Sequence, residues 1–270
     1  RLLSAPMARP HLELEAEARS LFAGDPPHLD GVAALIAGLC EVPPAEGEIG
    51  AALDGLADTA PAVCTDPEAV LNHVFVTLGF RGNTRSYYDP DNSYLHRVIE
   101  TRLGIPITLS LIAVEVGRRL GVGLDLVGFP GHVLIGDRLR ADRWFDPFEP
   151  GRVLDRAACQ DLLDQHFPGA TLQAEHTQVL TPAEVAHRML NNLKAIHLSH
   201  GNPSAALAAA RLAIALPGSL DAHRIELARL LASTGRFDEA ARQHELLAES
   251  DPSDAEDHRR AALRLRAHYN

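Results

Sequence analysis

Lysine is almost absent from this chain. Lys194 is the single lysine among 25 basic residues, and 36 acidic residues give a formal net charge of -11 at pH 7. Proteins that bind nucleic acid usually present a net basic face to the phosphates. The charge balance therefore argues against a nucleic-acid-binding protein, and no nucleic-acid partner is expected.

Cysteine and long apolar runs are also scarce. The three cysteines, Cys40, Cys64 and Cys159, are odd in number and far apart, which argues against a disulfide framework and fits a reducing cytoplasm. The longest largely apolar run, residues 105–116, is too short to cross a bilayer. The first ten residues contain no signal-peptide core. We therefore expect a cytoplasmic protein without membrane association.

Sequence signatures of cofactors and metals are missing. The glycines around Gly128 and Gly131 do not form the Gly-x-Gly-x-x-Gly pattern that opens a dinucleotide-binding helix. His197 and His200 lie three residues apart on a predicted helix, but a zinc site needs three or four ligands, and no other ligand joins them at a fixed spacing. No cofactor and no metal site are predicted.

Aromatic residues make up only 5% of the chain, so aliphatic side chains must fill the core. Residues 11–60 show apolar residues at helical spacing, interrupted by loops that contain prolines. Asp30 is expected to cap a second helix in this region. We assign residues 1–65 to an N-terminal helical segment whose role is packing.

The pattern changes over residues 66–178. Helices are predicted from Asp66 and over residues 93–103 and 107–120. Three short β-rich runs follow, at residues 124–127, 132–135 and 143–145. Helices followed by hairpins indicate an α+β domain with a small antiparallel sheet, in a chain that is predominantly helical.

Residues 179–270 are predicted to be helical and contain an internal repeat. Gly201 recurs as Gly235, and Ala206 recurs as Ala240, each 34 positions later. This period, with small residues where helices cross, resembles the tetratricopeptide repeat. The resemblance implies a third domain of paired helices that binds a protein or a peptide.

Several short motifs follow one another between residues 81 and 148. They are Arg81-Gly82-Asn83, Tyr87-Tyr88-Asp89-Pro90, Gly104-Ile105-Pro106, Gly128-Phe129-Pro130-Gly131-His132 and Phe145-Asp146-Pro147-Phe148. In this order they resemble the SirB-type transglutaminase-like proteins, which join a transglutaminase-like core to C-terminal tetratricopeptide-type helices. The resemblance implies a transglutaminase-like (papain-like) fold for residues 66–178.

The superfamily pattern places a cysteine at a helix start, a histidine on a strand and an aspartate in an Asp-Pro pair. The helix N-terminus favours the thiolate, the histidine accepts its proton, and the aspartate orients the histidine. The resemblance makes His132 and Asp146 remnants of this triad, with the start of the 107–120 helix pointing toward them. Pro106 stands at the cysteine position, where it suits a first helical turn but supplies no nucleophile.

Two hydroxyls follow Pro106 on the same predicted helix. Thr108 and Ser110 are two and four residues further along, so Ser110 returns to the direction of Pro106 one turn deeper. A hydroxyl there commonly bonds to a backbone carbonyl, and it is a far poorer nucleophile than a thiolate. The three cysteines lie outside the motif and are expected to be small, buried and inert.

The histidine–aspartate pair has two interpretations. It is a purely structural pair between strands, or it is the polar floor of a pocket that binds a small ligand without transforming it. In the second interpretation, aromatic residues flank the aspartate and a tyrosine loop closes over the pocket. The predicted pocket residues are Pro106, Tyr87, Tyr88, Trp144 and Phe148.

Three functions follow from these patterns. The first is a non-catalytic binding or regulatory protein whose helical repeats bind a protein or a peptide. The second is a hydrolase or acyl transferase that uses His132 and Asp146 with a hydroxyl or with a cysteine from elsewhere in the chain. The third is a structural module in an assembly. Pro106 favours binding over catalysis, because it removes the expected nucleophile.

Overall fold

The computed structural model describes residues 9–149, 152–250 and 253–267. The protein is predominantly helical with a small antiparallel sheet, as the sequence predicted. Contacts divide the described residues into two compact units. The first unit contains residues 26–185, and the second contains residues 9–25 and 186–267.

These units group the N-terminal residues in a way that sequence reasoning did not foresee. Residues 9–25 belong to the same unit as the C-terminal helices, whereas residues 26–65 belong to the unit that contains the sheet. The division into segments 1–65, 66–178 and 179–270 stays a prediction about domains.

Short helices surround one long apolar helix in the first unit. The long helix is α6 (Pro106–Arg119). The short ones are α2 (Leu29–Ala37), α3 (Glu48–Asp58), α4 (Pro67–Leu71), the π-helix η1 (Asn72–Thr77), the 3₁₀ helix η2 (Pro90–Ser93), α5 (Leu95–Thr101), α7 (Arg156–His166) and the 3₁₀ helix η3 (Ala174–Thr177). α6 is the central element, because every residue from Pro106 to Gly117 is buried.

Two predicted helix caps had different outcomes. The Asp66 carboxylate accepts a hydrogen bond of 2.8 Å from the Ala69 amide and so caps α4. The predicted cap at Asp30 is wrong, because α2 begins at Leu29 and the residue before it is His28. Asp30 lies in the first turn, where its carboxylate pairs with arginines of α6.

The main sheet has four strands in sequence order. They are β3 (Leu124–Phe129), β4 (His132–Asp137), β5 (Arg140–Phe145) and β6 (Val153–Leu154), and each pair is antiparallel. A two-residue turn at Pro130 and Gly131 joins β3 to β4, and Gly131 has a φ of 70° that favours glycine. A separate parallel pair is formed by β1 (Arg81–Gly82) and β2 (Leu103–Gly104).

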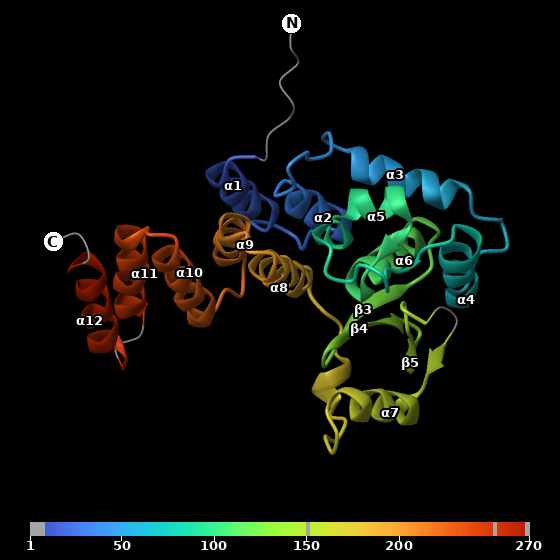
Figure 1. The fold of residues 1–270 in the computed structure, drawn as a ribbon. Helices are drawn as coiled ribbons and strands as arrows, with labels where there is room; N and C mark the ends of the chain where they lie inside the picture. The colour runs from blue at the N-terminus through green and yellow to red at the C-terminus, as the bar shows by residue number, and fades with distance from the viewer. Residues whose placement is uncertain (1–8, 150–151, 251–252, 268–270) are drawn as a thin grey trace, which may run out of the picture. The chain divides into compact units, whose positions relative to one another are not determined.

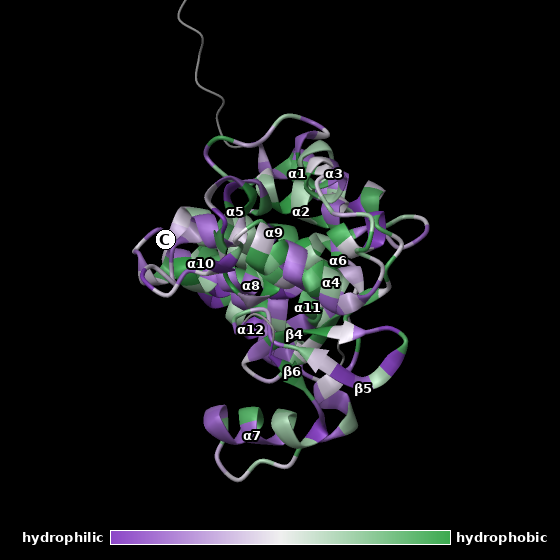
Figure 2. Cartoon of the chain, turned by 90° about the vertical axis from the view of Figure 1, so that its right-hand side faces the viewer, coloured by the Kyte–Doolittle hydropathy of each residue, from purple (hydrophilic) through white to green (hydrophobic). Residues whose placement is uncertain are grey.

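Helices cover both faces of the four-stranded sheet (Figure 1). α6 packs against β3 and β4, and a Cβ added at Gly117 would lie 3.1 Å from the Leu124 side chain. α7 lies on the opposite face and begins at Asp155, whose carboxylate caps it through the Ala158 amide. Figure 2 shows that α7 carries both hydrophobic and hydrophilic residues, as expected for a helix with one face against a sheet.

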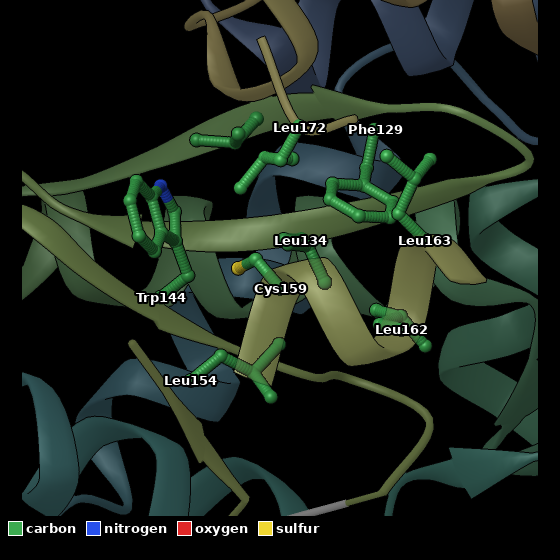
Figure 3. Packing of buried hydrophobic residues seen from close by; sticks show 9 residues of the cluster. Phe129, Leu134, Trp144, Leu154, Cys159, Leu162, Leu163 and Leu172 are labelled. Carbon is green, nitrogen blue, oxygen red and sulfur yellow. The ribbon is translucent and has the colours of Figure 1, made fainter. Parts of the chain in front are cut away.

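A hydrophobic cluster fills the space between the sheet and α7 (Figure 3). Its members come from the four strands β3 to β6, from α7 and from the segment that follows α7. They are Val127, Phe129, Leu134, Trp144, Leu154, Cys159, Leu162, Leu163 and Leu172. Because side chains alternate along a strand, residues such as Leu124 and Val133 face α6 instead.

The second unit consists of helices. They are α1 (His11–Leu21), most of α8 (Pro182–Ser199), α9 (Pro203–Ala215), α10 (Asp221–Ser233), α11 (Phe237–Ser250) and α12 (Ala255–Arg266). α9 and α11 begin at Pro203 and Phe237, 34 positions apart, which matches the period in the sequence. Ala206 and Ala240 are both fully buried, as small residues at a helix crossing should be.

The N-terminal helix packs within this second unit. α1 contacts α9, and its Leu14 and Ala18 are 1% and 0% exposed. α1 thus covers α9, which precedes α10 in the row of helices. In the part of the chain that the structure describes, no helix has the length and apolar character needed to span a membrane.

Candidate functional site

His132 and Asp146 form a hydrogen-bonded pair at one end of the main sheet. His132 is the first residue of β4, and Asp146 directly follows the end of β5. The imidazole Nε2 lies 3.0 Å from the carboxylate Oδ1. The two side chains are 11% and 5% exposed. The hydrogen bond expected from the motif is therefore present, and the imidazole keeps a small exposed surface.

Backbone amides also hold the Asp146 carboxylate. Oδ1 accepts hydrogen bonds from the amide of Phe148 at 2.8 Å and from the amide of Glu149 at 3.4 Å. Burial tends to raise the pKa of Asp146, but the hydrogen bond and charge of His132, together with the two amides, lower it below its ordinary value. The ionised carboxylate can orient the imidazole and stabilise its protonated form.

The pair lies on the sheet face that α7 covers. His132 is the register partner of Phe129, and directly paired residues share a face. The ring of His166, the last residue of α7, lies 6.4 Å from the His132 ring between centroids. α6 packs against the other face. The start of α6 follows β2, and the paired strand β1 brings Gly82 against the Phe148 ring. Since the Phe148 amide binds Asp146, the orientation of the α6 start toward the pair stays a prediction.

Pro106 and the two hydroxyls are buried at the start of α6. The Thr108 hydroxyl donates to the Asn92 carbonyl at 2.8 Å and accepts from the Ile105 amide at 3.1 Å. The Ser110 hydroxyl has no hydrogen-bond partner among the described residues. The prediction that Ser110 bonds to a backbone carbonyl is therefore wrong. Thr108 makes a bond of this kind. Both side chains are 0% exposed, so neither hydroxyl meets solvent.

Three of the predicted pocket residues come together at the surface. The Tyr87 ring lies 6.0 Å from the Phe148 ring and 5.3 Å from the Tyr88 ring, in edge-to-face geometry. Tyr87 and Tyr88 are 41% and 68% exposed. Because the Phe148 amide binds Asp146, this aromatic group lies beside the histidine–aspartate pair.

Trp144 does not belong to this aromatic group. Its side chain is 6% exposed and lies in the cluster between the sheet and α7, with Leu154 and Cys159 (Figure 3). The prediction that Trp144 lines a pocket is wrong, because α7 covers the face on which it lies.

Two asparagines that sequence reasoning missed hold the tyrosine loop. The Asn92 side chain donates to the carbonyls of Ser86 and Tyr87 at 2.7 and 3.0 Å. Asn83 donates to the Asn92 side-chain oxygen at 3.0 Å. Since Thr108 binds the Asn92 carbonyl, this residue ties the loop to α6. The available signal was an asparagine at each end of a tyrosine-containing loop.

Comparison with known proteins identifies the fold. The sequence pattern of the transglutaminase-like superfamily matches residues 47–191, more than half of the 270 residues. The chain belongs to the transglutaminase-like superfamily. The matched region includes the histidine–aspartate pair, the tyrosine loop and all of α6.

Relatives of the transglutaminase-like region occur in bacteria and animals. A UPF0162 protein of Xylella fastidiosa is 43% identical over 136 residues, 48% of this chain and 48% of its own length. A UPF0162 protein of Pseudomonas aeruginosa is 37% identical over 128 residues, 47% of each chain. Human F-box only protein 21 is 33% identical over 141 residues, 48% of this chain and 22% of its own length.

The matches leave much of each protein uncovered. The chain spans about half the length of the bacterial relatives it matches. No solved structure matches the chain. Among the residues that the structure describes, no three histidine, cysteine, aspartate or glutamate side chains converge as metal ligands do.

The two buried cysteines of this transglutaminase-like protein do not have the character of activated nucleophiles. Cys159 belongs to α7 and lies in the cluster between this helix and the sheet, where burial raises its pKa to about 11. Burial and the nearby charge of Asp66 raise the pKa of Cys64. Cys40 is partly exposed. An activated thiol has a lowered pKa, so Cys159 and Cys64 have the opposite character.

Thiol reactivity provides a direct check of this assignment. A pKa two units above the ordinary value of 9.0 leaves roughly a hundredfold less thiolate on Cys159 at neutral pH. We expect iodoacetamide to modify Cys40 first and Cys159 at least about a hundredfold more slowly than in the urea-unfolded chain. Peptide mass spectrometry over time measures each site. Equal rates for Cys159 in the folded and unfolded chain would contradict its assignment to the core.

Gly82 supports Phe148 by lacking a side chain. A Cβ at this position would clash with the Phe148 ring. We expect Gly82→Ala to displace the ring and to destabilise the first unit by about 1–3 kcal/mol. Urea unfolding followed by the fluorescence of Trp144, the only tryptophan, measures the loss. Phe148→Ala should remove most of the penalty in the double variant; additive losses would show that the two residues do not interact.

Proposed function

We propose that this chain is a non-catalytic binding or regulatory protein of SirB type, built on its transglutaminase-like core. The observation that carries the proposal is Pro106, which occupies the position of the expected cysteine as the buried first residue of α6. A transglutaminase-type reaction needs an activated nucleophile there. Proline has none, and its missing amide also removes one of the donors at the helix start.

The surroundings of the pair support binding. Thr108 and Ser110 are fully buried in α6, and the Thr108 hydroxyl is engaged by the Asn92 carbonyl and the Ile105 amide, which does not favour either residue as a nucleophile. The exposed rings of Tyr87 and Tyr88 form an apolar and hydrogen-bonding surface next to the pair. Such surfaces suit the recognition of a small ligand or a peptide side chain.

We further propose that the second unit contains tetratricopeptide-type repeats that bind a protein or a peptide. The equal spacing of α9 and α11 and the buried Ala206 and Ala240 support this assignment. Stacked helix pairs offer extended surfaces to peptides. The three free cysteines suit a cytoplasmic protein. The match to one fifth of human F-box only protein 21 supports the core as a module that joins other segments.

A second candidate function is a hydrolase or an acyl transferase. One observation favours it: the histidine and the ionised aspartate keep the hydrogen bond that a catalytic dyad needs. Such an enzyme would use His132 and Asp146 with a hydroxyl or a displaced thiol as the nucleophile.

Peptide selection on the full chain tests the binding proposal. Peptides are selected from a random library, and their contact region is mapped by amide hydrogen exchange. When a selected peptide binds, we expect amide exchange in α8 to α11 to slow and the peptide to be recovered intact. The His132→Ala variant should bind the peptide with the same affinity as the wild type, within about twofold. Peptide cleaved or acylated only when His132 is present would favour the enzyme. A failure to select any peptide would contradict the proposed role of the repeats.

A further inference from the structure

Two histidine pairs join neighbouring helices of the second unit. His187 of α8 and His223 of α10 are stacked, with ring centroids 4.7 Å apart and planes 6° apart. His244 of α11 and His258 of α12 face each other, with their Nδ1 atoms 3.1 Å apart. Protonation of both members of either pair would place two positive charges in contact across two helices.

One hydrogen bond of the first pair requires a neutral ring, that of His223. His187 Nε2 lies 3.0 Å from the Pro217 carbonyl, which can only accept, so this nitrogen carries the proton. The Leu220 amide donates to His223 Nδ1 at 2.9 Å, so this nitrogen must be unprotonated. This second bond caps the first turn of α10. Protonation of His223 at Nδ1 would break the cap and charge a ring stacked on His187.

Charged groups on both helices act on the first pair. Lys194 of α8 and Glu226 of α10 face each other with Nζ 2.5 Å from Oε2. Burial lowers the pKa of His223 most, the His187 and Lys194 charges lower it further, and Glu226 opposes them. The ring is therefore held neutral at neutral pH.

The second pair shares one proton. When two Nδ1 atoms form a hydrogen bond, one donates and the other accepts, so the bond is lost once both carry protons. Burial, the charge of His258 and the charge of Arg229 on α10 lower the pKa of His244. Glu245 of α11 is engaged by Arg266 of α12 and by Arg242, so its charge is already neutralised.

We propose that these two histidine pairs form an acid-sensitive switch that loosens the α8–α10 and α11–α12 contacts when the rings become protonated. The direction follows from linkage. A histidine whose pKa is lower in the folded chain than its ordinary value of about 6.5 contributes stability above that pH. The contribution is lost as the pH falls toward the folded value, because the unfolded chain binds the proton first. The inference does not depend on the proposed function.

Hydrogen exchange on the full chain at pH 7.5 and 5.5, in EDTA and corrected for the intrinsic rate, tests the switch. We expect the protection of the first turn of α10 and of α12 to fall at least about tenfold at the lower pH, with α6 unchanged. His223→Asn keeps an oxygen that can accept the Leu220 amide but does not titrate. This variant should retain protection of α10 at pH 5.5, and His258→Gln should retain that of α12.

The matched control is His200→Asn, which changes an exposed histidine outside both pairs and should lose protection as the wild type does. Equal protection of the wild type at both pH values would overturn the proposal. The same loss in His223→Asn and His258→Gln would overturn it as well. If a variant does not fold, NMR titration of the wild-type rings decides. Midpoints of His223 and His244 equal to those in the urea-unfolded chain would contradict the switch.

Discussion

Replacing Arg119 by alanine is expected to destabilise the first unit by about 3–5 kcal/mol. The guanidinium is 11% exposed and joins three carboxylates from three helices. It lies 2.5 Å from Glu115, 2.8 Å from Asp30 and 2.6 Å from Asp54. Glu115 is 1% exposed, so loss of this partner leaves a buried charge with less compensation. The same contacts hold α2 and α3 against α6.

Arg118 provides the matched control. It also pairs with Glu115 and Asp30, but its side chain is 38% exposed. Arg118→Ala should therefore cost less than about 1 kcal/mol. Urea unfolding followed by Trp144 fluorescence compares the two variants. Equal losses would show that burial of the ion pairs does not determine their contribution.

Leu14→Ala is expected to destabilise the second unit by about 2–5 kcal/mol. Leu14 is 1% exposed on α1, which packs against α9, so the substitution leaves a cavity at this contact. Leu12→Ala on the same helix is the control, because Leu12 is 66% exposed and its loss should change stability by less than about 0.5 kcal/mol. Amide exchange in α9 at increasing urea concentration measures the stability of both variants. Equal effects would contradict the packing of α1 in this unit.

The contact of α1 with α9 leads us to expect that a fragment of residues 179–270 folds poorly on its own. A fragment that begins at residue 179 lacks α1 and exposes the face of α9 that this helix covers. Helices stacked in a row need neighbours to bury their apolar faces. Sequence periodicity revealed the paired helices but not their N-terminal neighbour, because contacts between distant segments leave no periodic signal.

Local patterns predicted most elements of the first unit. Apolar spacing gave α6, and alternating runs gave β3, β4 and β5, although each strand extends further than its β-rich run. α7 was missed because its apolar stripe consists of only Cys159, Leu162 and Leu163. The helix predicted from Asp66 continues beyond α4 as the π-helix η1, and this change of hydrogen-bond register was not predicted because it depends on packing and not on composition.

The part of the site that could be predicted from the sequence is the part that follows from strand pairing. His132 and Asp146 come from adjacent strands, so their hydrogen bond follows from strand pairing. Trp144 was misplaced because alternation gives two faces but does not say which helix covers each. For the same reason the sequence did not reveal that His132 lies on the sheet face that α7 covers, whereas α6 packs against the other face.

The proposed absence of an internal nucleophile is tested most directly by acyl trapping. The full chain is incubated with an activated thioester, and adducts are mapped by peptide mass spectrometry in the wild type, His132→Ala and Asp146→Asn. We expect the same low background in all three proteins, with no preferred adduct at Thr108, Ser110 or the cysteines. The two hydroxyls are fully buried, and burial raises the pKa of Cys64 and Cys159. A single acylated residue that forms in the wild type and disappears in both variants would contradict the assignment and identify the protein as an acyl-transfer enzyme.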